Sequence, residues 1–218
     1  MNTRTCSIAA VALCLFASVA SAGVLHGTLR FKPTPRAKPE GPASLRGVTD
    51  AVVYVEQVPD AVEKKLATRR RFLFFRSART PDVLNVVQRQ RFEPRVVAAV
   101  AGTRVAFLNL DRVYHNVFSV SSSRRFDLGK NPPGSRDTVE FERAGVVNLH
   151  CDIHPDEQGY LVVTPNRVYA RPDSLGRWRL PKLPAGSYKL RMFHPVRGEL
   201  TREVVMPSRG DLAVDLVK

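Results

Sequence analysis

Cysteine, tryptophan and long apolar runs are scarce in this sequence. It has 3 cysteines and 1 tryptophan in 218 residues, and two of the cysteines, Cys6 and Cys14, lie within the first 22 residues. The remaining Cys151 has no partner for an internal disulfide, which excludes a small fold held by disulfides. After Gly23, charged residues interrupt every apolar stretch before it reaches the roughly 20 residues of a membrane-spanning helix. The chain beyond Gly23 is therefore not expected to cross a membrane.

The longest apolar run lies at the N-terminus and has the features of an export signal. Arg4 precedes the apolar residues 8–17, and the small residues 20–22 follow them. This order is typical of a secretory signal peptide, so residues 1–22 are predicted to be removed and the protein to be periplasmic. A lipoprotein anchor on Cys14 is the alternative, but the residue before that cysteine is not small, as such signals require.

Positive charge is in excess and is concentrated in one stretch. The formal net charge is +14, and ten lysines and arginines crowd between Lys64 and Arg95. The export signal and the absence of a nucleic-acid-binding motif argue against a nucleic-acid partner. The basic stretch is interpreted either as a solvated, solubilising surface or as a docking patch for an acidic protein or an anionic membrane surface.

Short alternating apolar runs separated by Gly, Pro, Asp and Asn predict strands and turns. Turns every eight to twelve residues or so between residues 96 and 164 indicate an antiparallel sandwich or barrel. A helix is expected only at residues 59–67, where Val62 and Leu66 share one face. The expected strands are residues 24–31, 51–57, 96–100, 103–109, 116–120, 137–141, 145–150, 160–164, 178–180, 187–193, 201–205 and 212–217.

His115, Cys151 and His154 are the candidate metal ligands. The Cys151-x-x-His154 spacing lets both side chains turn toward one point, and a sandwich can bring the earlier histidine to meet them. A thiolate with two imidazoles in a trigonal arrangement is the ligand set that selects copper for electron transfer. The same residues also permit a zinc site. A cysteine nucleophile with a histidine base is disfavoured, because no local cysteine-protease signature is present.

Four motifs follow one another between about residues 92 and 164: GTRVAFLNLD at 102–111, HNVFS at 115–119, FDLG at 126–129 and GVVNLHCDIHP at 145–155. Together they resemble the plastocyanin- and amicyanin-type cupredoxins, most closely the bacterial cupredoxin-domain proteins labelled methylamine-utilisation-like. The resemblance implies a cupredoxin-like Greek-key β-sandwich that holds one copper ion. It further implies that His115, Cys151 and His154 are the equatorial ligands and that hydrogen bonds of Asn116 tie the two ligand loops together.

The axial position departs from that family pattern. The short-loop cupredoxins continue Cys-x-x-His-x-x-Met, and Glu157 stands where the methionine is expected. A carboxylate oxygen favours the cupric ion, so a lowered potential and a colour other than the usual blue are expected. Gln158 is the alternative axial ligand through its amide oxygen. The third possibility is that neither residue binds and that the site is three-coordinate or open.

Residues 173–190 resemble the carboxypeptidase-regulatory-like, transthyretin-like β modules. Gly176 and Gly186 suit hairpin turns, and the alternating positions Trp178, Leu180, Tyr188 and Leu190 supply core side chains. Such modules have no catalytic residues, so a structural or adhesive role is expected. His194 lies just past the strand and is interpreted as an ordinary residue rather than a ligand, because no cysteine or second histidine lies near it in sequence.

The sequence therefore predicts an all-β chain with a cupredoxin-like sandwich at 89–165 and a second small β-sandwich module at 166–218. Residues 23–88 supply strands that could belong to either sandwich, together with a basic insertion. The predicted function is electron transfer by an exported mononuclear copper protein that is not an enzyme. Its partner is expected to be an acidic redox protein such as a cytochrome or dehydrogenase. The alternative is a copper carrier, a copper store or a ligand-binding module without a redox role.

Overall fold

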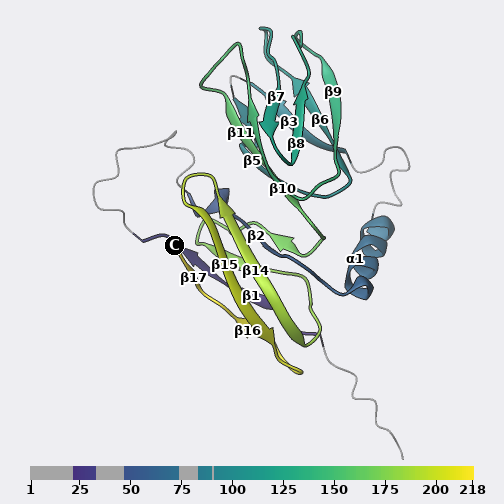
Figure 1. Ribbon diagram of the computed structural model, residues 1–218, viewed down its shortest axis with the longest axis vertical. Helices are drawn as coiled ribbons and strands as arrows, with labels where there is room; N and C mark the ends of the chain where they lie inside the picture. The colour runs from purple at the N-terminus through teal and green to yellow at the C-terminus, as the bar shows by residue number, and fades with distance from the viewer. Residues whose placement is uncertain (1–21, 33–46, 74–82, 90) are drawn as a thin grey trace, which may run out of the picture.

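The computed structural model describes residues 22–32, 47–73, 83–89 and 91–218, so residues 1–21 of the predicted signal peptide lie outside the described residues. These residues form two β-sandwich modules, one above the other in Figure 1, with a single α-helix beside them. None of the described helices has the length and apolar character of a membrane span. The prediction of an all-β chain with two β-sandwich modules is confirmed by this arrangement.

The first sandwich consists of two sheets with apolar side chains between them. One sheet has the order β5 (Val96–Val100), β11 (Gln158–Thr164), β10 (Gly145–His150), β7 (Phe118–Ser121), β8 (Arg124–Asp127). The other has the order β4 (Phe92–Glu93), β3 (Val83–Gln88), β6 (Thr103–Asn109), β9 (Arg136–Phe141). Alternation along each strand sends every second side chain into the core, as Val147 and Leu149 of β10 illustrate on either side of exposed Asn148.

The second module combines the N-terminal strands with the C-terminal ones. β1 (Leu25–Arg30) pairs with β13 (Arg177–Arg179), β16 (Leu212–Ala213) and β17 (Leu216–Val217). β2 (Val52–Val55) lies between β12 (Tyr169–Ala170) and β14 (Gly186–His194), and β15 (Gly198–Met206) follows at the edge. The two strands that the sequence could not assign, β1 and β2, thus pair within this module.

The helix α1 (Asp60–Leu73) and the short 3-10 helix η2 (Val48–Asp50) also lie against the second module. Val62 is buried in its core and Leu66 packs against it, as their shared face predicts. Glu63 accepts hydrogen bonds from the backbone N–H and the guanidinium of Arg167, in the segment that leads from the first sandwich to the second module. The helix is therefore anchored where the chain crosses between modules.

Several predicted boundaries agree with the structure and others do not. The strands at 96–100, 103–109 and 145–150 begin and end where the sequence places them. The helix extends to Leu73 instead of ending at residue 67. The sequence did not indicate β3, β4, β8 or β12. Because β3 pairs in parallel with β6, the first sandwich includes residues before the predicted start at 89.

The two modules meet through a compact apolar interface. Val96 and Val162, on the outer face of the β5–β11 pair, form one cluster with Val52 and Phe193 of the second module, and all four are 9% exposed or less. Tyr160 adds a ring contact with Phe193, with the centroids 6.2 Å apart. Burying each such side chain contributes about 1.5–3 kcal/mol. The second module therefore braces the strand β11, whose first residue directly follows Glu157.

His194, the histidine interpreted as an ordinary residue, is a satisfied core side chain. It is fully buried, its Nδ1 accepts hydrogen bonds from the backbone N–H groups of Val196 and Arg197, and its Nε2–H donates to the carbonyl of Gly47. Because Nδ1 accepts two hydrogen bonds, His194 is the neutral tautomer with its proton on Nε2. Burial, reinforced by the charge of Arg197, lowers the pKa of His194 below its ordinary value.

This environment predicts a pH-dependent stability. In the unfolded chain histidine has a pKa of about 6.5, whereas burial lowers the pKa of His194 in the folded protein. The contribution of neutral His194 to the free energy of unfolding is therefore complete above that pH. Below it, the free energy of unfolding falls by up to about 1.4 kcal/mol per pH unit. Urea unfolding at pH 7.5 and 5.5 measures the loss. His194→Asn keeps an acceptor near Nδ1 and cannot be protonated, so its stability should fall less between the two pH values. Equal losses in both proteins would contradict the assignment.

Candidate metal centre

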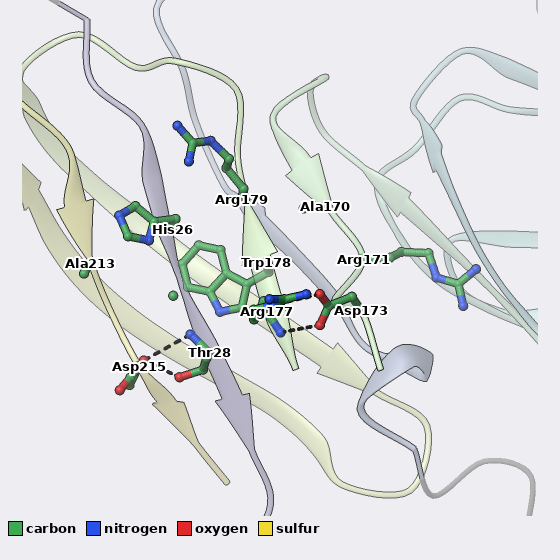
Figure 2. Close-up of a pocket in the computed structure, with 11 residues that line it drawn as sticks. His26, Thr28, Ala170, Arg171, Asp173, Arg177, Trp178, Arg179, Ala213 and Asp215 are labelled. Carbon is green, nitrogen blue, oxygen red and sulfur yellow. Dashed lines mark hydrogen bonds and ion pairs between the residues drawn. The ribbon is translucent and has the colours of Figure 1, made fainter. Parts of the chain in front are cut away.

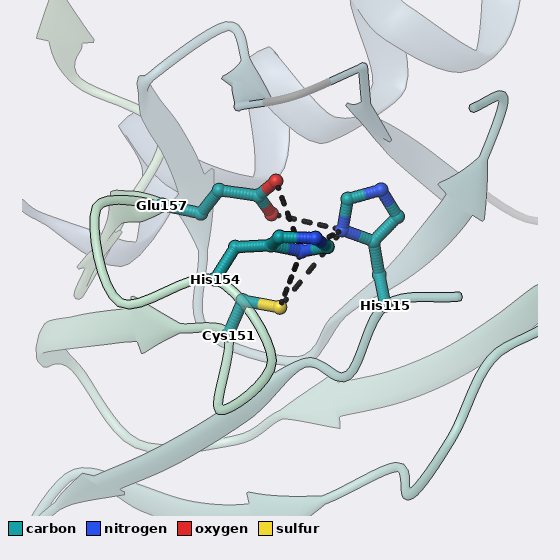
Figure 3. Close-up of side chains that lie close together, drawn as sticks. All are labelled: His115, Cys151, His154 and Glu157. Carbon is teal, nitrogen blue, oxygen red and sulfur yellow. Dashed lines mark hydrogen bonds and ion pairs between the residues drawn. The ribbon is translucent and has the colours of Figure 1, made fainter. Parts of the chain in front are cut away.

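Four side chains converge at one end of the first sandwich (Figure 3). His115 lies in the segment between β6 and β7, Cys151 directly follows β10, and His154 and Glu157 lie in the turn that leads into β11. One donor atom from each of the four lies within 4.8 Å of the other three. The fold therefore brings together the three residues that the sequence predicted as equatorial ligands and Glu157, the predicted axial candidate.

The distances describe a compact cage rather than three close donors and one distant donor. His115 Nδ1 lies 3.2 Å from His154 Nδ1 and 3.9 Å from Cys151 Sγ, and that sulfur lies 3.6 Å from His154 Nδ1. The Glu157 carboxylate lies 3.0 Å from His115 Nδ1 and 3.5 Å from His154 Nδ1. Glu157 is thus as close to the imidazoles as they are to each other.

Burial differs sharply among the four side chains. His115, Cys151 and Glu157 are at most 3% exposed, whereas the side chain of His154 is 38% exposed. One imidazole edge therefore connects a buried cage to the surface.

Asp111 determines which nitrogen of His115 faces the cage. Its carboxylate Oδ2 lies 3.2 Å from His115 Nε2 and accepts a hydrogen bond from the N–H of that nitrogen. In the neutral imidazole, Nδ1 is then left with a lone pair directed at Cys151, His154 and Glu157. A carboxylate on the remote nitrogen is the usual way in which proteins orient a metal-binding histidine and raise its basicity.

Backbone contacts around Asn116 hold the loops of His115 and Cys151 together. The N–H of Asn116 donates to Cys151 Sγ at 3.5 Å, which stabilises negative charge on the sulfur. Its side-chain amide donates to Asp127. The N–H of Gly129 and that amide hold the pKa of the Asp127 carboxyl below its usual range. His115 and Asn131 also exchange two backbone hydrogen bonds, so the histidine loop is fixed to the segment after β8.

Glu157, and not Gln158, has its side-chain oxygens in the cage. Gln158 is the first residue of β11, where it pairs with His150, and its carbonyl accepts a hydrogen bond from Arg95. The Glu157 carboxylate instead faces both histidines and accepts a hydrogen bond from the side-chain amide of Gln88. Of the two axial candidates that the sequence offered, Glu157 is the one whose side-chain oxygens lie in the cage. That Glu157 binds a metal stays a prediction.

The chemistry of the donors fits a metal cation. Two imidazole nitrogens, a sulfur and a carboxylate present lone pairs to one another across a buried space. Buried charged and polar groups are costly unless they are paired, hydrogen-bonded or bound to a metal. Thiolate and imidazole donors suit copper and zinc, and the carboxylate adds a hard anionic oxygen. A cation at the centre satisfies all four donors at once.

Sequence reasoning missed two residues that contact the cage. Asp111 ends the motif at residues 102–111, and its position four residues before His115 could have indicated the contact between them. Gln88 gave no such signal, because it comes from β3, a strand that the apolar pattern did not reveal. His150 points away from the cage, as alternation predicts, and its ring stacks near Phe118 with the centroids 5.5 Å apart.

A separate pocket of about 690 Å³ lies in the second module, lined by the paired strands β1 and β13 and by Ala170, Arg171, Asp173, Ala213 and Asp215 (Figure 2). Trp178 is buried beneath it, and the charged groups around it are paired within the chain. The guanidinium of Arg177 bonds to Asp173, and the Thr28 hydroxyl and N–H donate to Asp215. This pairing leaves the pocket without a converging set of groups like that of the metal cage.

Comparison with known proteins gives matches in structure only. No family model matches the chain, and no curated protein matches it in sequence. A purple cupredoxin from Nitrosopumilus maritimus is 23% identical over 37% of this chain and 99% of its own, with a TM-score of 0.34. A copper(I) amicyanin mutant is 22% identical over 38% of this chain and 82% of its own, with a TM-score of 0.36.

The copper-containing nitrite reductase of Thermus scotoductus is 26% identical over 40% of this chain and 23% of its own, with a TM-score of 0.37. The solved structures to which part of this chain is similar are therefore cupredoxin proteins. These scores are low and the matches cover well under half of the chain, so the interpretation of the site rests on its own geometry. The resemblance of residues 173–190 to carboxypeptidase-regulatory-like modules stays a prediction.

The contact between Asp111 and His115 predicts that charge at residue 111 supports metal binding. Asp111→Asn keeps the side-chain shape but weakens the acceptor for Nε2–H, so the affinity for cobalt(II) should fall about 10- to 100-fold. Spectrophotometric competition with a chelator measures the affinity. Asp152→Asn makes the same charge change at an exposed residue beside Cys151 and should have a much smaller effect. Equal losses in the two variants would mean that only net charge matters.

Proposed function

We propose that this chain binds one copper ion through His115, Cys151, His154 and Glu157 and transfers single electrons. The observation that carries the proposal is the contrast within the cage, where three ligand side chains are buried and the edge of His154 is 38% exposed. Burial of three ligands excludes water and added ligands, while one conjugated edge at the surface gives electrons a short route. Bound copper would supply the one-electron redox chemistry.

The protein's contribution is to keep the donor atoms in place while the charge of the ion changes. Cys151 and Glu157 lie beside strand ends that belong to one sheet, and Asn116 donates to the sulfur. The histidine loop is tied by the backbone pair of His115 and Asn131. A cage whose supports are backbone hydrogen bonds rearranges little between oxidation states, which favours fast electron transfer.

The surface around His154 supports a docking role for this end of the molecule. Four exposed apolar side chains come from the two ligand segments, Leu110, Val113, Tyr114 and Ile153, with exposures of 47%, 47%, 56% and 39%. Grouped apolar side chains on a surface mark interaction sites more often than scattered ones do. We propose that a redox partner docks here and approaches the His154 edge.

The remaining proposals concern partner and location. An excess of basic residues favours an acidic redox protein, such as a cytochrome or dehydrogenase, whose association would slow as salt is raised. Five of the ten lysines and arginines between Lys64 and Arg95 lie outside the described side chains. We further propose a periplasmic location and no enzymatic activity, which fractionation of the source cells and assays for oxidase or nitrite-reducing activity would test.

Glu157 favours a second candidate, the binding and delivery of metal without redox chemistry. A thiolate, two imidazoles and a carboxylate at similar mutual distances also suit a four-coordinate zinc site. A carrier should release copper to an acceptor chelator within minutes and show no reversible voltammetric wave. An electron-transfer protein should retain copper through repeated reduction and oxidation.

Cys151 gives the direct test of the copper site. Residues 23–218 with one equivalent of Cu(II) should show an intense thiolate-to-copper absorption, with its position shifted from the usual blue by the Glu157 carboxylate. Cys151→Ser should abolish that band, and electron paramagnetic resonance should report an ordinary copper spectrum. The wild-type protein should also give a reversible one-electron wave. Absence of the band from the wild type would refute the proposal.

Ile153 tests the proposed electron route through His154. Ile153→Asp places a charge beside the exposed ligand edge, so two molecules should approach each other less closely and electron self-exchange should slow about tenfold or more. Nuclear magnetic resonance line widths of mixed Cu(I) and Cu(II) samples measure the rate. Val205→Asp is the matched control, because Val205 is 68% exposed on β15 of the second module. An equal effect of the two variants would show that electrons do not enter and leave at this end of the molecule.

A further inference from the structure

We propose that Gln88 is the positioning residue for Glu157 and that it sets the preference of the cage for Cu(II) over Cu(I). This inference rests on the proposed function, because it assigns the control of that site to a residue outside the ligand set. The juxtaposition that carries it is a buried amide from β3 facing a buried carboxylate from the turn before β11.

The contact is direct and enclosed. Gln88 Nε2 donates to Glu157 Oε2 at 3.3 Å, and the two residues are 1% and 3% exposed. The same oxygen lies 3.0 Å from His115 Nδ1, whereas the other oxygen, Oε1, is the one nearer His154 at 3.5 Å. The amide therefore distinguishes the two carboxylate oxygens and fixes the rotation of the carboxylate plane.

Gln88 itself has little freedom to move. It ends β3 and pairs in register with Asn109 of β6, and its carbonyl accepts the N–H of Leu110. Asn109 in turn donates from its side chain to the carbonyls of Val113 and Asn131, in the segments that flank His115. The donor of Gln88 is thus placed by the same strand pair that places the histidine loop, and its position relative to the cage is fixed.

A neutral amide suits this task better than a charged partner. A carboxylate buried to this degree needs hydrogen-bond donors, and a lysine or arginine there would cancel the charge that attracts the ion. Gln88 donates one hydrogen bond and leaves the negative charge intact. Because the attraction between two charges scales with each charge, an oriented carboxylate stabilises Cu(II) more than Cu(I). Loss of the orientation should therefore raise the reduction potential.

The experiment compares Gln88→Met, which keeps an unbranched side chain and removes the donor, with the wild type. Cu(II) affinity should fall about tenfold with a smaller fall for Cu(I), so the potential should rise, by up to about 59 mV where the Cu(I) affinity does not change at all. Competition titrations measure the affinities and voltammetry measures the potential. Gln88→Asn, which retains an amide but withdraws it by one methylene, should move both quantities in the same direction.

A double-mutant cycle tests whether Gln88 acts through Glu157. In a Glu157→Gln background the charge is gone, so Gln88→Met should change the potential and the Cu(II) affinity by less than half as much as in the wild type. Unfolding of the metal-free variants by urea controls for damage to the fold. An unchanged potential in Gln88→Met, or an equal shift in both backgrounds, would overturn the inference.

Cobalt(II) affinity separates failure of this inference from failure of the proposed function. If the wild type binds cobalt(II) but gives no thiolate–copper band or reversible wave, the electron-transfer proposal fails. Gln88→Met then still tests positioning, because cobalt(II) should bind about tenfold more weakly to this variant than to the wild type. Equal cobalt(II) affinities would overturn the role of Gln88 whichever metal the protein carries.

Discussion

Four lone-pair donors directed at one point repel one another, and the rest of the first sandwich is arranged to hold them there. Asp111 accepts a hydrogen bond from the Nε2–H of His115, so Nδ1 presents its lone pair to the cage. The N–H of Asn116 faces the sulfur of Cys151, and the amide of Gln88 faces the carboxylate of Glu157. Three of the four donors, those of His115, Cys151 and Glu157, thus have a partner that keeps them oriented toward the cage.

The sheet topology makes this convergence achievable with short segments. β10 and β11 are paired along their full length, so the Cys151–Glu157 turn is closed at both ends by the ladder. β11 is in turn paired in parallel with β5, and its outer face packs against the second module through Val162 and Tyr160. The second module therefore contributes to the site indirectly, by bracing the strand that begins directly after Glu157.

Much of this could be predicted from the sequence, and the rest was not visible for physical reasons. Alternation and turn residues located β5, β6 and β10, and motif order brought His115 into a set with Cys151 and His154. The parallel partner β3 was missed because its pairing is long-range and its short apolar run lies beside a basic stretch. Gln88 was missed with it. The position of Glu157 relative to both imidazoles depends on the fold of the turn, which spacing alone does not specify.

The acidic groups around the cage favour the more highly charged of two cations. The Glu157 carboxylate and the sulfur of Cys151 face the space between the donors, and the carboxylate of Asp111 lies behind His115. Two positive charges are attracted by this set more strongly than one, so the reduced ion is the less favoured form. If the cage carries copper as we propose, the reduced protein would give up its electron readily. It would then suit the donor side of an exchange, with an acceptor that approaches the exposed edge of His154 past the exposed apolar side chains of the two ligand segments, Leu110, Val113, Tyr114 and Ile153.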